Sequence, residues 1–404
     1  MKEGWVVKTL GDIAEVKGGK RVPKGYSLQT TVTAHPYLTV SDFTDEGSIN
    51  TSKIRYISND VFEAIKRYTI SSKDIFISIA GTIGKTGFIP PELEGANLTE
   101  NACKLVLNTG IDRDYLFYYT KTDDFSAQAG THTRTAAQPK LALERLKSIK
   151  LPVAPLPEQQ RIVAILDEAF ESIAIAKANA EKNLQNAKAL FESYLQGVFS
   201  QRGDGWKKGR LVDFTVTVST GPFGSLLHKS DYVSDGVPLV NPINIIDNYI
   251  VPNESKQISD ATKARLQSYI LQESDIVIAR RGEIGRCAVV TVKEAGWICG
   301  TGCFFIRPLP TTDSRFLANL IRSVDYRKKL EEVSSGATML NLSNKSLCDL
   351  EVIMPSFEEQ KSILQKLDLL SEETQRLESL YQQKITALDE LKKALLHQAF
   401  SGQL

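Results

Sequence analysis

The 404-residue sequence contains no apolar run near the 18 or so residues that a membrane-spanning helix needs. Its start, Met1-Lys2-Glu3-Gly4-Trp5, carries an acidic residue and no apolar segment follows it, so we expect no secretory signal. Cysteine is scarce: the five residues are an odd number at irregular spacing, which predicts reduced thiols in a cytoplasmic protein. Cys299 and Cys303 lack the histidine partners of a zinc site, so we expect buried thiols there and no bound metal.

Catalytic signatures are also missing. Only four histidines occur, none near a matching nucleophile and acid in both halves of the chain, and there is no Gly-x-Ser-x-Gly or HExxH motif. The run from Gly81 to Thr86 resembles the end of a phosphate-binding loop, but Ile79 stands where that loop requires glycine. The formal net charge of +1 gives no globally basic signature of nucleic-acid binding. We therefore expect no active site and no cofactor bound by this chain.

The chain is instead one pattern written twice. A shift of 201 positions aligns Trp5 with Trp206, and it keeps the same register 195 residues later, where Phe199-Ser200 meets Phe400-Ser401. Between these ends, Asp74-Ile75 falls on Asp275-Ile276 and Glu158-Gln159 falls on Glu359-Gln360. Two copies account for almost the whole chain, so we expect a pseudo-twofold internal repeat.

Each copy divides into a mixed part and a helical part. The first 150-odd residues of each copy combine short β-rich runs, glycine and proline turns and a few helical stretches, which predicts a compact α+β domain. The last 45 or so residues are rich in Ala, Leu, Glu, Lys and Gln and have no proline after their start, which predicts one long helix. The predicted segments are two similar globular α/β domains, 1–157 and 204–357, and two long helices, 158–203 and 358–404.

The two helices carry apolar residues at alternating steps of four and three, the spacing of a coiled-coil seam. A helix of about 40 residues spans roughly 60 Å, which is longer than one small domain can cover. We therefore expect the helices to cover each other as an antiparallel coiled coil, rather than each packing on its own domain. The predicted seam contains Ile162, Leu166, Ile173, Asn183, Leu190 and Tyr194 in the first helix, and Ile363, Leu367, Leu377, Lys384, Leu391 and Leu395 in the second.

Charge divides in the same way, because the globular parts carry +3 and +2 and the helical parts −2 each. A polyanion would therefore bind the globular parts, through polar, basic and glycine-bearing loops. Solvated loops with no role are the alternative for any one of these residues. The candidate contacts are Lys20, Arg21, Lys24, Lys85, Thr131, Thr133, Arg134 and Lys140 in the first copy, and Lys229, Arg280, Arg281, Arg286, Thr338, Asn341, Asn344 and Lys345 in the second.

Three runs carry a family resemblance: Leu156-Pro-Glu-Gln-Gln-Arg-Ile-Val163, Asp275-Ile-Val-Ile-Ala-Arg-Arg-Gly-Glu-Ile-Gly285 and Phe400-Ser-Gly-Gln-Leu404. With the duplicated layout, they resemble the specificity subunits of type I restriction–modification enzymes over essentially the whole chain. The second copy departs at its helix start, where Phe357-Glu-Glu-Gln360 replaces Leu156-Pro-Glu-Gln159.

The resemblance implies two target-recognition domains that each read one half of a split DNA sequence, with the helices as spacer and as dock for two methyltransferase subunits. Those subunits would bring S-adenosylmethionine, and separate restriction and motor subunits would bring ATP hydrolysis, Mg²⁺ and cleavage, so this chain itself would be no enzyme. Two alternatives stay open: a coiled-coil scaffold that binds proteins but no DNA, and a self-contained methyltransferase. The second lacks the Asn-Pro-Pro-aromatic signature, which Asn241-Pro242-Ile243-Asn244 does not supply.

Overall fold

The computed structural model describes residues 2–130, 141–200, 205–253, 256–334 and 340–404. The chain forms two compact units, Met1–Glu181 with Gln383–Leu404, and Lys182–Gln382. Each unit holds one globular lobe, residues 2–155 (lobe 1) or 205–355 (lobe 2), and parts of both long helices. The boundaries between the two units fall inside both long helices. They therefore do not test the four segments predicted from the sequence, 1–157, 158–203, 204–357 and 358–404, which stay a prediction.

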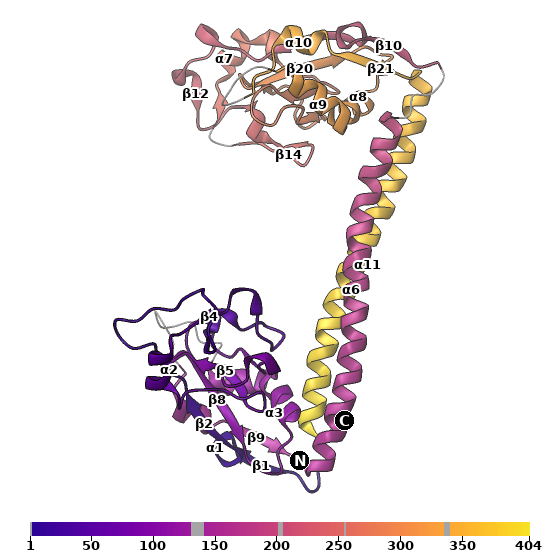
Figure 1. The fold of residues 1–404 in the computed structure, drawn as a ribbon. Helices are drawn as coiled ribbons and strands as arrows, with labels where there is room; N and C mark the ends of the chain where they lie inside the picture. Colours follow the sequence, from indigo (N-terminus) through magenta and orange to yellow (C-terminus); the bar gives the residue numbers. More distant parts are fainter. Residues whose placement is uncertain (1, 131–140, 201–204, 254–255, 335–339) are drawn as a thin grey trace. The chain divides into compact units, whose positions relative to one another are not determined.

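Lobe 1 combines three small sheets with short helices (Figure 1). A four-stranded antiparallel sheet has the order β2-β8-β5-β6, a three-stranded sheet has the order β4-β3-β7, and β1 pairs with β9. The strands are β1 (Val6–Thr9), β2 (Ala14–Gly18), β3 (Pro36–Leu38), β4 (Arg55–Tyr56), β5 (Ile75–Ser78), β6 (Thr86–Gly87), β7 (Asn97–Leu98), β8 (Ala102–Leu107) and β9 (Lys150–Val153), and the α-helices are α1 (Leu10–Ile13), α2 (Asn59–Ile65), α3 (Arg113–Thr120), α4 (Asp123–Ala129) and α5 (Leu143–Lys147).

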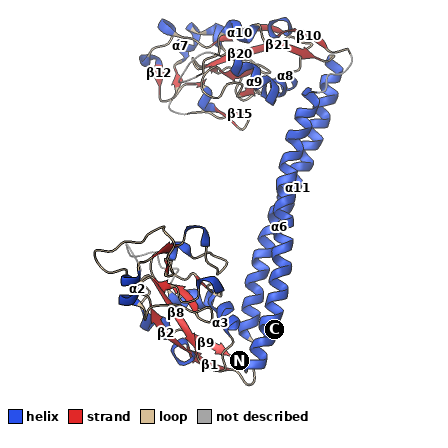
Figure 2. Ribbon diagram, in the orientation of Figure 1, coloured by secondary structure: helices blue, strands red, loops and turns tan. Residues whose placement is uncertain are grey.

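Lobe 2 repeats this plan, with sheets β11-β20-β17-β18 and β12-β16-β13-β19 and the pair β10-β21 (Figure 2). The main addition is the hairpin β14-β15. The strands are β10 (Lys207–Arg210), β11 (Thr215–Thr220), β12 (Tyr232–Val233), β13 (Val237–Val240), β14 (Ile245–Ile246), β15 (Tyr249–Ile250), β16 (Gln257–Ile258), β17 (Ile276–Ala279), β18 (Cys287–Val289), β19 (Ile298–Cys299), β20 (Cys303–Pro308) and β21 (Glu351–Met354), and the α-helices are α7 (Asp260–Arg265), α8 (Ser314–Arg322), α9 (Val324–Glu332) and α10 (Asn344–Cys348).

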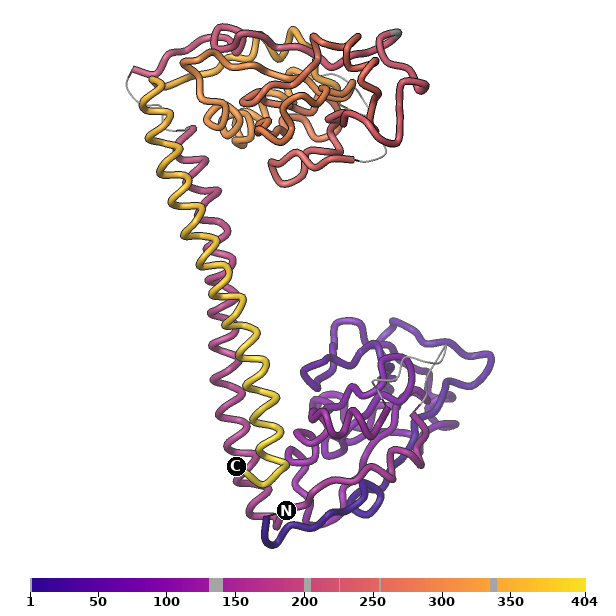
Figure 3. Tube along the Cα trace, turned by 180° about the vertical axis from the view of Figure 1, so that it is seen from behind, coloured from indigo at the N-terminus to yellow at the C-terminus, as the bar shows by residue number. Residues whose placement is uncertain are grey.

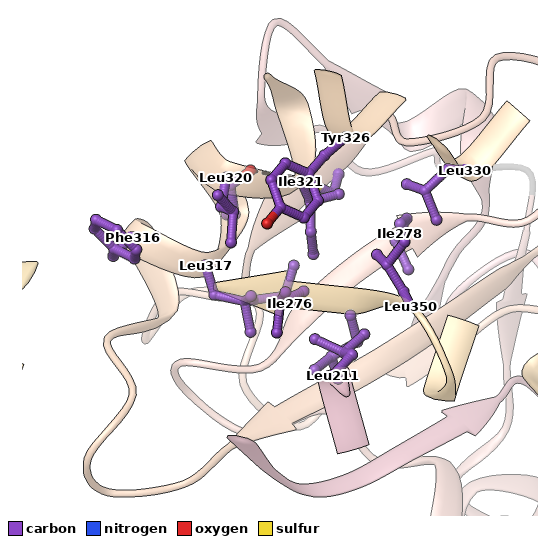
Figure 4. Packing of buried hydrophobic residues seen from close by; sticks show 14 of the residues in the cluster. Leu211, Ile276, Ile278, Phe316, Leu317, Leu320, Ile321, Tyr326, Leu330 and Leu350 are labelled. Atoms are coloured by element: carbon purple, nitrogen blue, oxygen red, sulfur yellow. Dashed lines mark hydrogen bonds between the residues drawn. The ribbon is translucent and has the colours of Figure 1, made fainter. Parts of the chain in front are cut away.

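A large hydrophobic core lies in each lobe between one sheet and the two short helices that follow it. The sheet is β2-β8-β5-β6 with α3 and α4 in lobe 1, and β11-β20-β17-β18 with α8 and α9 in lobe 2. In lobe 2, Leu317 and Ile321 of α8 lie over Ile276 and Ile278 of β17, and Phe316 of the same helix belongs to the same cluster (Figure 4). All five side chains are fully buried. The equivalent core of lobe 1 gathers β5, β8 and α3. The α+β fold and its duplication, predicted from the 201-residue shift, are confirmed.

The long helices α6 (Leu156–Ser200) and α11 (Phe357–Ser401) lie side by side within each unit (Figures 1 and 3). In the first unit, Lys392 lies over the ring of Phe170 and the Lys177 ammonium is 2.7 Å from an Asp389 carboxylate oxygen. Because rising numbers in α6 meet falling numbers in α11, this pair is antiparallel, as predicted.

Candidate nucleic-acid interface

The seam of the helix pair follows the predicted stripe only in part. Ile162, Leu166 and Ile173 are buried, as is Leu367, while Ile363, Leu377 and Leu395 are partly buried. The prediction is wrong for Asn183, Leu190, Tyr194, Lys384 and Leu391, which are exposed.

At four of these five positions, all but Leu391, the residue that follows is more buried than the predicted one. Leu184 and Phe191 are partly buried where Asn183 and Leu190 were expected, and Ile385 is partly buried where Lys384 was expected. A straight α-helix has 3.6 residues per turn, so a strict seven-residue count drifts about 20° per heptad. Over three or four heptads the drift approaches one residue position, and the contact stripe passes to the next side chain.

Each lobe is fastened to its long helix by a buried glutamine. The Gln159 side-chain oxygen accepts a hydrogen bond from the Asp112 amide (2.8 Å), and its amide group donates to the Ala154 carbonyl (2.7 Å). Asp112 in turn is the N-cap of α3 and accepts from the amides of Asp114 and Tyr115. The 201-residue shift aligns Gln159 with Gln360, and this recurrence at the start of both helices is the sequence signal for a role that was not predicted.

The second lobe repeats this fastening. Gln360 accepts from the Asp313 amide (2.8 Å) and donates to the Pro355 carbonyl (3.0 Å), and Asp313 caps α8. Eight residues further along each long helix, an aspartate makes a second attachment: Tyr118 of α3 donates to Asp167, and Arg315 of α8 pairs with Asp368. Two attachment points about 12 Å apart along a helix fix the orientation of a lobe on it.

A glycine directly after β2 and another directly after β11 allow the backbone to approach a distant segment of the same lobe closely. A Cβ at Gly19 would lie 2.0 Å from the Thr99 carbonyl oxygen, and one at Gly221 would lie 2.0 Å from the Gly300 carbonyl oxygen. Both loops begin next to candidate contacts. In lobe 1, Lys20, Arg21 and Lys24 are exposed there.

Not all of these cations are free of protein partners. Arg21 pairs with Glu100, which raises the pKa of the guanidinium, and the Lys20 ammonium lies 5.9 Å from the centre of the Tyr68 ring. Lys24 is exposed, and no hydrogen bond or ion pair of its side chain occurs within the described residues. In lobe 2, Lys229 and Lys345 are exposed. The side-chain amide group of Asn344 donates to the Val218 backbone carbonyl at 3.1 Å.

The cations of the glycine turns between β5 and β6 and between β17 and β18, Lys85 and Arg286, both bond to an earlier loop of their own lobe. The Lys85 ammonium donates to the Phe43 carbonyl (3.0 Å) and lies 2.9 Å from an Asp45 carboxylate oxygen, whose pKa it lowers. At the equivalent position in lobe 2, the Arg286 guanidinium donates to the Pro242 carbonyl at 2.6 Å. Both side chains therefore tie the turn to an earlier loop, so only part of each cation faces solvent.

A second group of candidates does come together in lobe 2. Arg281 and Asn341 form an antiparallel β-bridge, and the Leu342 amide donates to the Arg280 carbonyl at 2.9 Å. These bonds place the Arg280-Arg281 pair beside Asn341. Thr131, Thr133, Arg134, Lys140 and Thr338 lie outside the described residues.

Within the described ranges, no group of three or more His, Cys, Asp or Glu residues could hold a metal ion, and no helix combines the length and apolar character needed to cross a membrane. All five cysteines are free, and four of them are buried. Burial raises the pKa of the Cys103, Cys299 and Cys303 thiols.

Residues 2–186 and 205–387 each match the family model described as the type I restriction modification DNA specificity domain. The chain belongs to this family. The two matched segments begin near the start of each lobe and extend into the long helix that follows it, so the family unit is a lobe with its helix. This organisation is the one predicted from the 201-residue shift.

Several named specificity subunits are similar to the chain along its full length. The type I restriction enzyme EcoBI specificity subunit of Escherichia coli is 20% identical over 424 residues, covering 100% of this chain and 86% of that protein. The putative type I restriction enzyme MjaX specificity subunit of Methanocaldococcus jannaschii is 23% identical, covering 100% and 94%.

Solved structures share the fold. The HsdS subunit from Thermoanaerobacter tengcongensis superposes with a TM-score of 0.68 at 19% identity, covering 100% of this chain and 98% of that one. A chain from a study of complex assembly and conformational transition of the type I R-M system gives a TM-score of 0.76 at 20% identity, covering 100% and 99%. At these identities the likeness speaks for the specificity-subunit fold alone.

Proposed function

We propose that this chain is the DNA-recognition subunit of a type I restriction–modification complex, in which each lobe reads one half of a bipartite DNA target. The observation that carries the proposal is the repeated attachment of lobe to helix: Gln159 and Gln360 make the same bonds to Asp112 and Asp313. Two like lobes, each held in a fixed orientation on a helix, suit a target with two half-sites.

Lysines and arginines of the lobes would contact phosphates and set the position of the duplex, and a few side chains that reach base edges would set the sequence. Lys24, Lys229, Arg281 and Lys345 are exposed and suit the phosphate role. The paired helices would supply a stiff spacer, because the buried side chains of their seam hold them together.

The long helices also offer apolar surface to partner subunits. Leu190 and Leu391, which are related by the 201-residue shift, are 49% and 46% exposed, and Ile175, Leu369 and Leu380 are exposed as well. Exposed large apolar side chains along both long helices suit a protein interface. Equivalent leucines on two repeats suit two identical partners, so we propose that two methyltransferase subunits dock there.

Methylation, with its S-adenosylmethionine, would then belong to those subunits, and ATP, Mg²⁺ and DNA cleavage to restriction and motor subunits. This chain would perform no chemistry itself, in keeping with relatives that are named specificity subunits. We also propose a cytoplasmic location, where genomic DNA is accessible and where the five free cysteines stay reduced.

Methylome sequencing of a host that carries the chain and its methyltransferase subunits would identify the target. Binding to duplexes with that target is then measured against salt: phosphate contacts predict a linear fall of log affinity with log salt concentration, whereas a protein-binding scaffold would show no such binding. Inserting one base pair between the half-sites rotates one of them by about 34°, so affinity should fall steeply. Unchanged affinity after one or two inserted base pairs would contradict the spacer role.

A further inference from the structure

Arg280 occupies a position that is part of the hydrophobic core in lobe 1. The 201-residue shift aligns it with Ile79, which is buried in the core cluster. The backbone is the same in both lobes: the Leu141 amide donates to the Ile79 carbonyl at 2.8 Å, and the Leu342 amide donates to the Arg280 carbonyl at 2.9 Å. The change from isoleucine to arginine therefore concerns the side chain and not the path of the chain.

A second difference accompanies the first. Phe304 stands at the position equivalent to Cys103, and the Arg280 guanidinium carbon lies 5.5 Å from the centre of its ring. The aromatic face supports the planar guanidinium and restricts its orientation. The pair Ile79 and Cys103 is thus replaced by an arginine that rests on a ring.

Apart from the Phe304 ring, the guanidinium of Arg280 has no protein partner within the described ranges. Its Nε is buried and makes no hydrogen bond, and its side chain forms no ion pair there. Burial and the neighbouring Arg281 lower its pKa, which reports the cost of keeping this charge partly out of water. Asn341, held beside it by the bridge to Arg281, also has a buried side-chain oxygen without a partner. Unpaired charge at a core position is costly, so a functional partner is expected to complete it.

We propose that Arg280 is a specificity-determining residue of lobe 2 that pairs with O6 and N7 of a guanine in the major groove of the target. The inference rests on the proposed function and names the base that one side chain reads. A guanidinium fork matches the two in-plane acceptors of guanine. The restricted side chain on Phe304 suits a fixed base edge, whereas the adjacent exposed Arg281 suits a phosphate.

The test uses the full chain with its methyltransferase subunits and fluorescein-labelled duplexes that carry the methylome-derived target. In a series of duplexes, each guanine of both half-sites is replaced in turn by 7-deazaguanine, which lacks the N7 acceptor. We expect one replacement to lower wild-type affinity by about 5- to 150-fold. Arg280→Ile should lose a similar factor on the natural target and become insensitive to that one replacement.

Arg280→Ile restores the residue of lobe 1, so it should fold, and its thermal midpoint should equal or exceed that of wild type because a partly buried charge with a buried, unpaired Nε is removed. Arg210→Ala is the matched control, since Arg210 is exposed on β10 and pairs with Asp213 and Asp349. It should keep wild-type affinity and the same sensitivity to 7-deazaguanine.

Three results would overturn the assignment to guanine. They are an Arg280→Ile variant that binds as tightly as wild type, a variant still sensitive to every replacement, and a uniform loss on all duplexes with a salt slope reduced by about one, which indicates a phosphate contact. Failure of the proposed function looks different, because wild type would then not distinguish the target from a scrambled duplex at any salt concentration.

Discussion

The side-chain oxygen of Gln159 accepts a hydrogen bond from the backbone amide of Asp112 at 2.8 Å, and it does so from the first turns of α6. Asp112 caps α3, so this one bond connects the start of the long helix with the start of a helix in lobe 1. Gln159 is fully buried, and its amide group is also bonded to the Gly110 and Ala154 carbonyls. The glutamine thus satisfies polar backbone groups that water does not reach.

Replacing Gln159 by leucine should therefore destabilise the first unit by about 2–4 kcal/mol, because it leaves at least one amide and one carbonyl buried without partners. Hydrogen exchange measured by mass spectrometry should show faster exchange at the start of α3, while the equivalent start of α8 stays protected by Gln360. Gln160→Leu is the matched control, since Gln160 is the exposed neighbour and should change neither. Equal protection of α3 in both variants would refute the role of Gln159.

The second attachment, through Asp167, predicts a change in spacer selection and not only in stability. Tyr118→Phe removes the hydroxyl that donates to Asp167 but keeps the ring beside Phe170. Loss of this bond loosens lobe 1 on its helix, although the apolar cluster of Trp5 and Tyr115 with Ile162 and Leu166 remains. Binding should therefore tolerate half-site spacings one base pair longer or shorter than the natural one. The measurement is affinity across a series of spacer lengths.

The matched control for this series is Glu168→Gln, an exposed position next to Asp167 on the same helix. It should retain the wild-type spacer profile. A Tyr118→Phe variant whose profile is equally narrow would show that the bond from Tyr118 to Asp167 does not set the half-site spacing.

Leu190 and Leu195 distinguish the seam that a strict seven-residue repeat predicts from the seam that the structure shows. A strict heptad places Leu190 in the seam, whereas in the structure Leu190 is 49% exposed and Leu195 is 9% exposed, in the cluster with Leu364 and Leu367. Leu195→Ala should therefore destabilise the second unit by about 2–4 kcal/mol. Leu190→Ala should change its stability by no more than about 0.5 kcal/mol.

Urea unfolding followed by tryptophan fluorescence measures both variants in a background with Trp5 and Trp297 replaced by phenylalanine, so that the signal comes from Trp206, which packs against the same cluster. Under the proposed function, Leu190→Ala should also weaken the binding of methyltransferase subunits, which Leu195→Ala affects only through loss of folding. If Leu190→Ala lowered the free energy of unfolding more than Leu195→Ala, the seam would follow the strict seven-residue repeat.

The architecture was predictable because one local signal, the 201-residue shift, recurs over the whole chain. β5 begins at Ile75 and β17 at Ile276, so the structure keeps the register that the sequence displays. The later part of the seam was not predictable by counting in sevens, because the number of residues per turn depends on how strongly the helices supercoil. That is a property of the packed pair and not of Asn183 or Lys384.

Candidate contacts were harder to predict for a related reason. Lys85 and Arg286 were expected at turn edges, but their partners, the carbonyls of Phe43 and Pro242, lie more than 40 residues earlier in the chain. Such partners become visible only once the sheets are assembled. Arg280 is distinguished from Arg286 by an observation that needs both levels. The sequence shift aligns it with Ile79, and in the described residues its guanidinium makes neither a hydrogen bond nor an ion pair, whereas Arg286 donates to the Pro242 carbonyl.

Lys121, at the C-terminal end of α3, predicts a rise of stability with pH. Burial, reinforced by the nearby charge of Lys392 and opposed by Asp45 and Glu46, lowers the pKa of its ammonium to about 8. Between pH 8 and about 10.5 the folded chain has released this proton while the unfolded chain still holds it, so the free energy of unfolding increases with pH in that window. Thermal midpoints of wild type relative to Lys121→Met should therefore rise from pH 8 to 10, whereas Lys73→Met, at an exposed lysine of the same lobe, should parallel wild type throughout. A constant difference between wild type and Lys121→Met over this range would mean that the buried ammonium keeps its ordinary pKa.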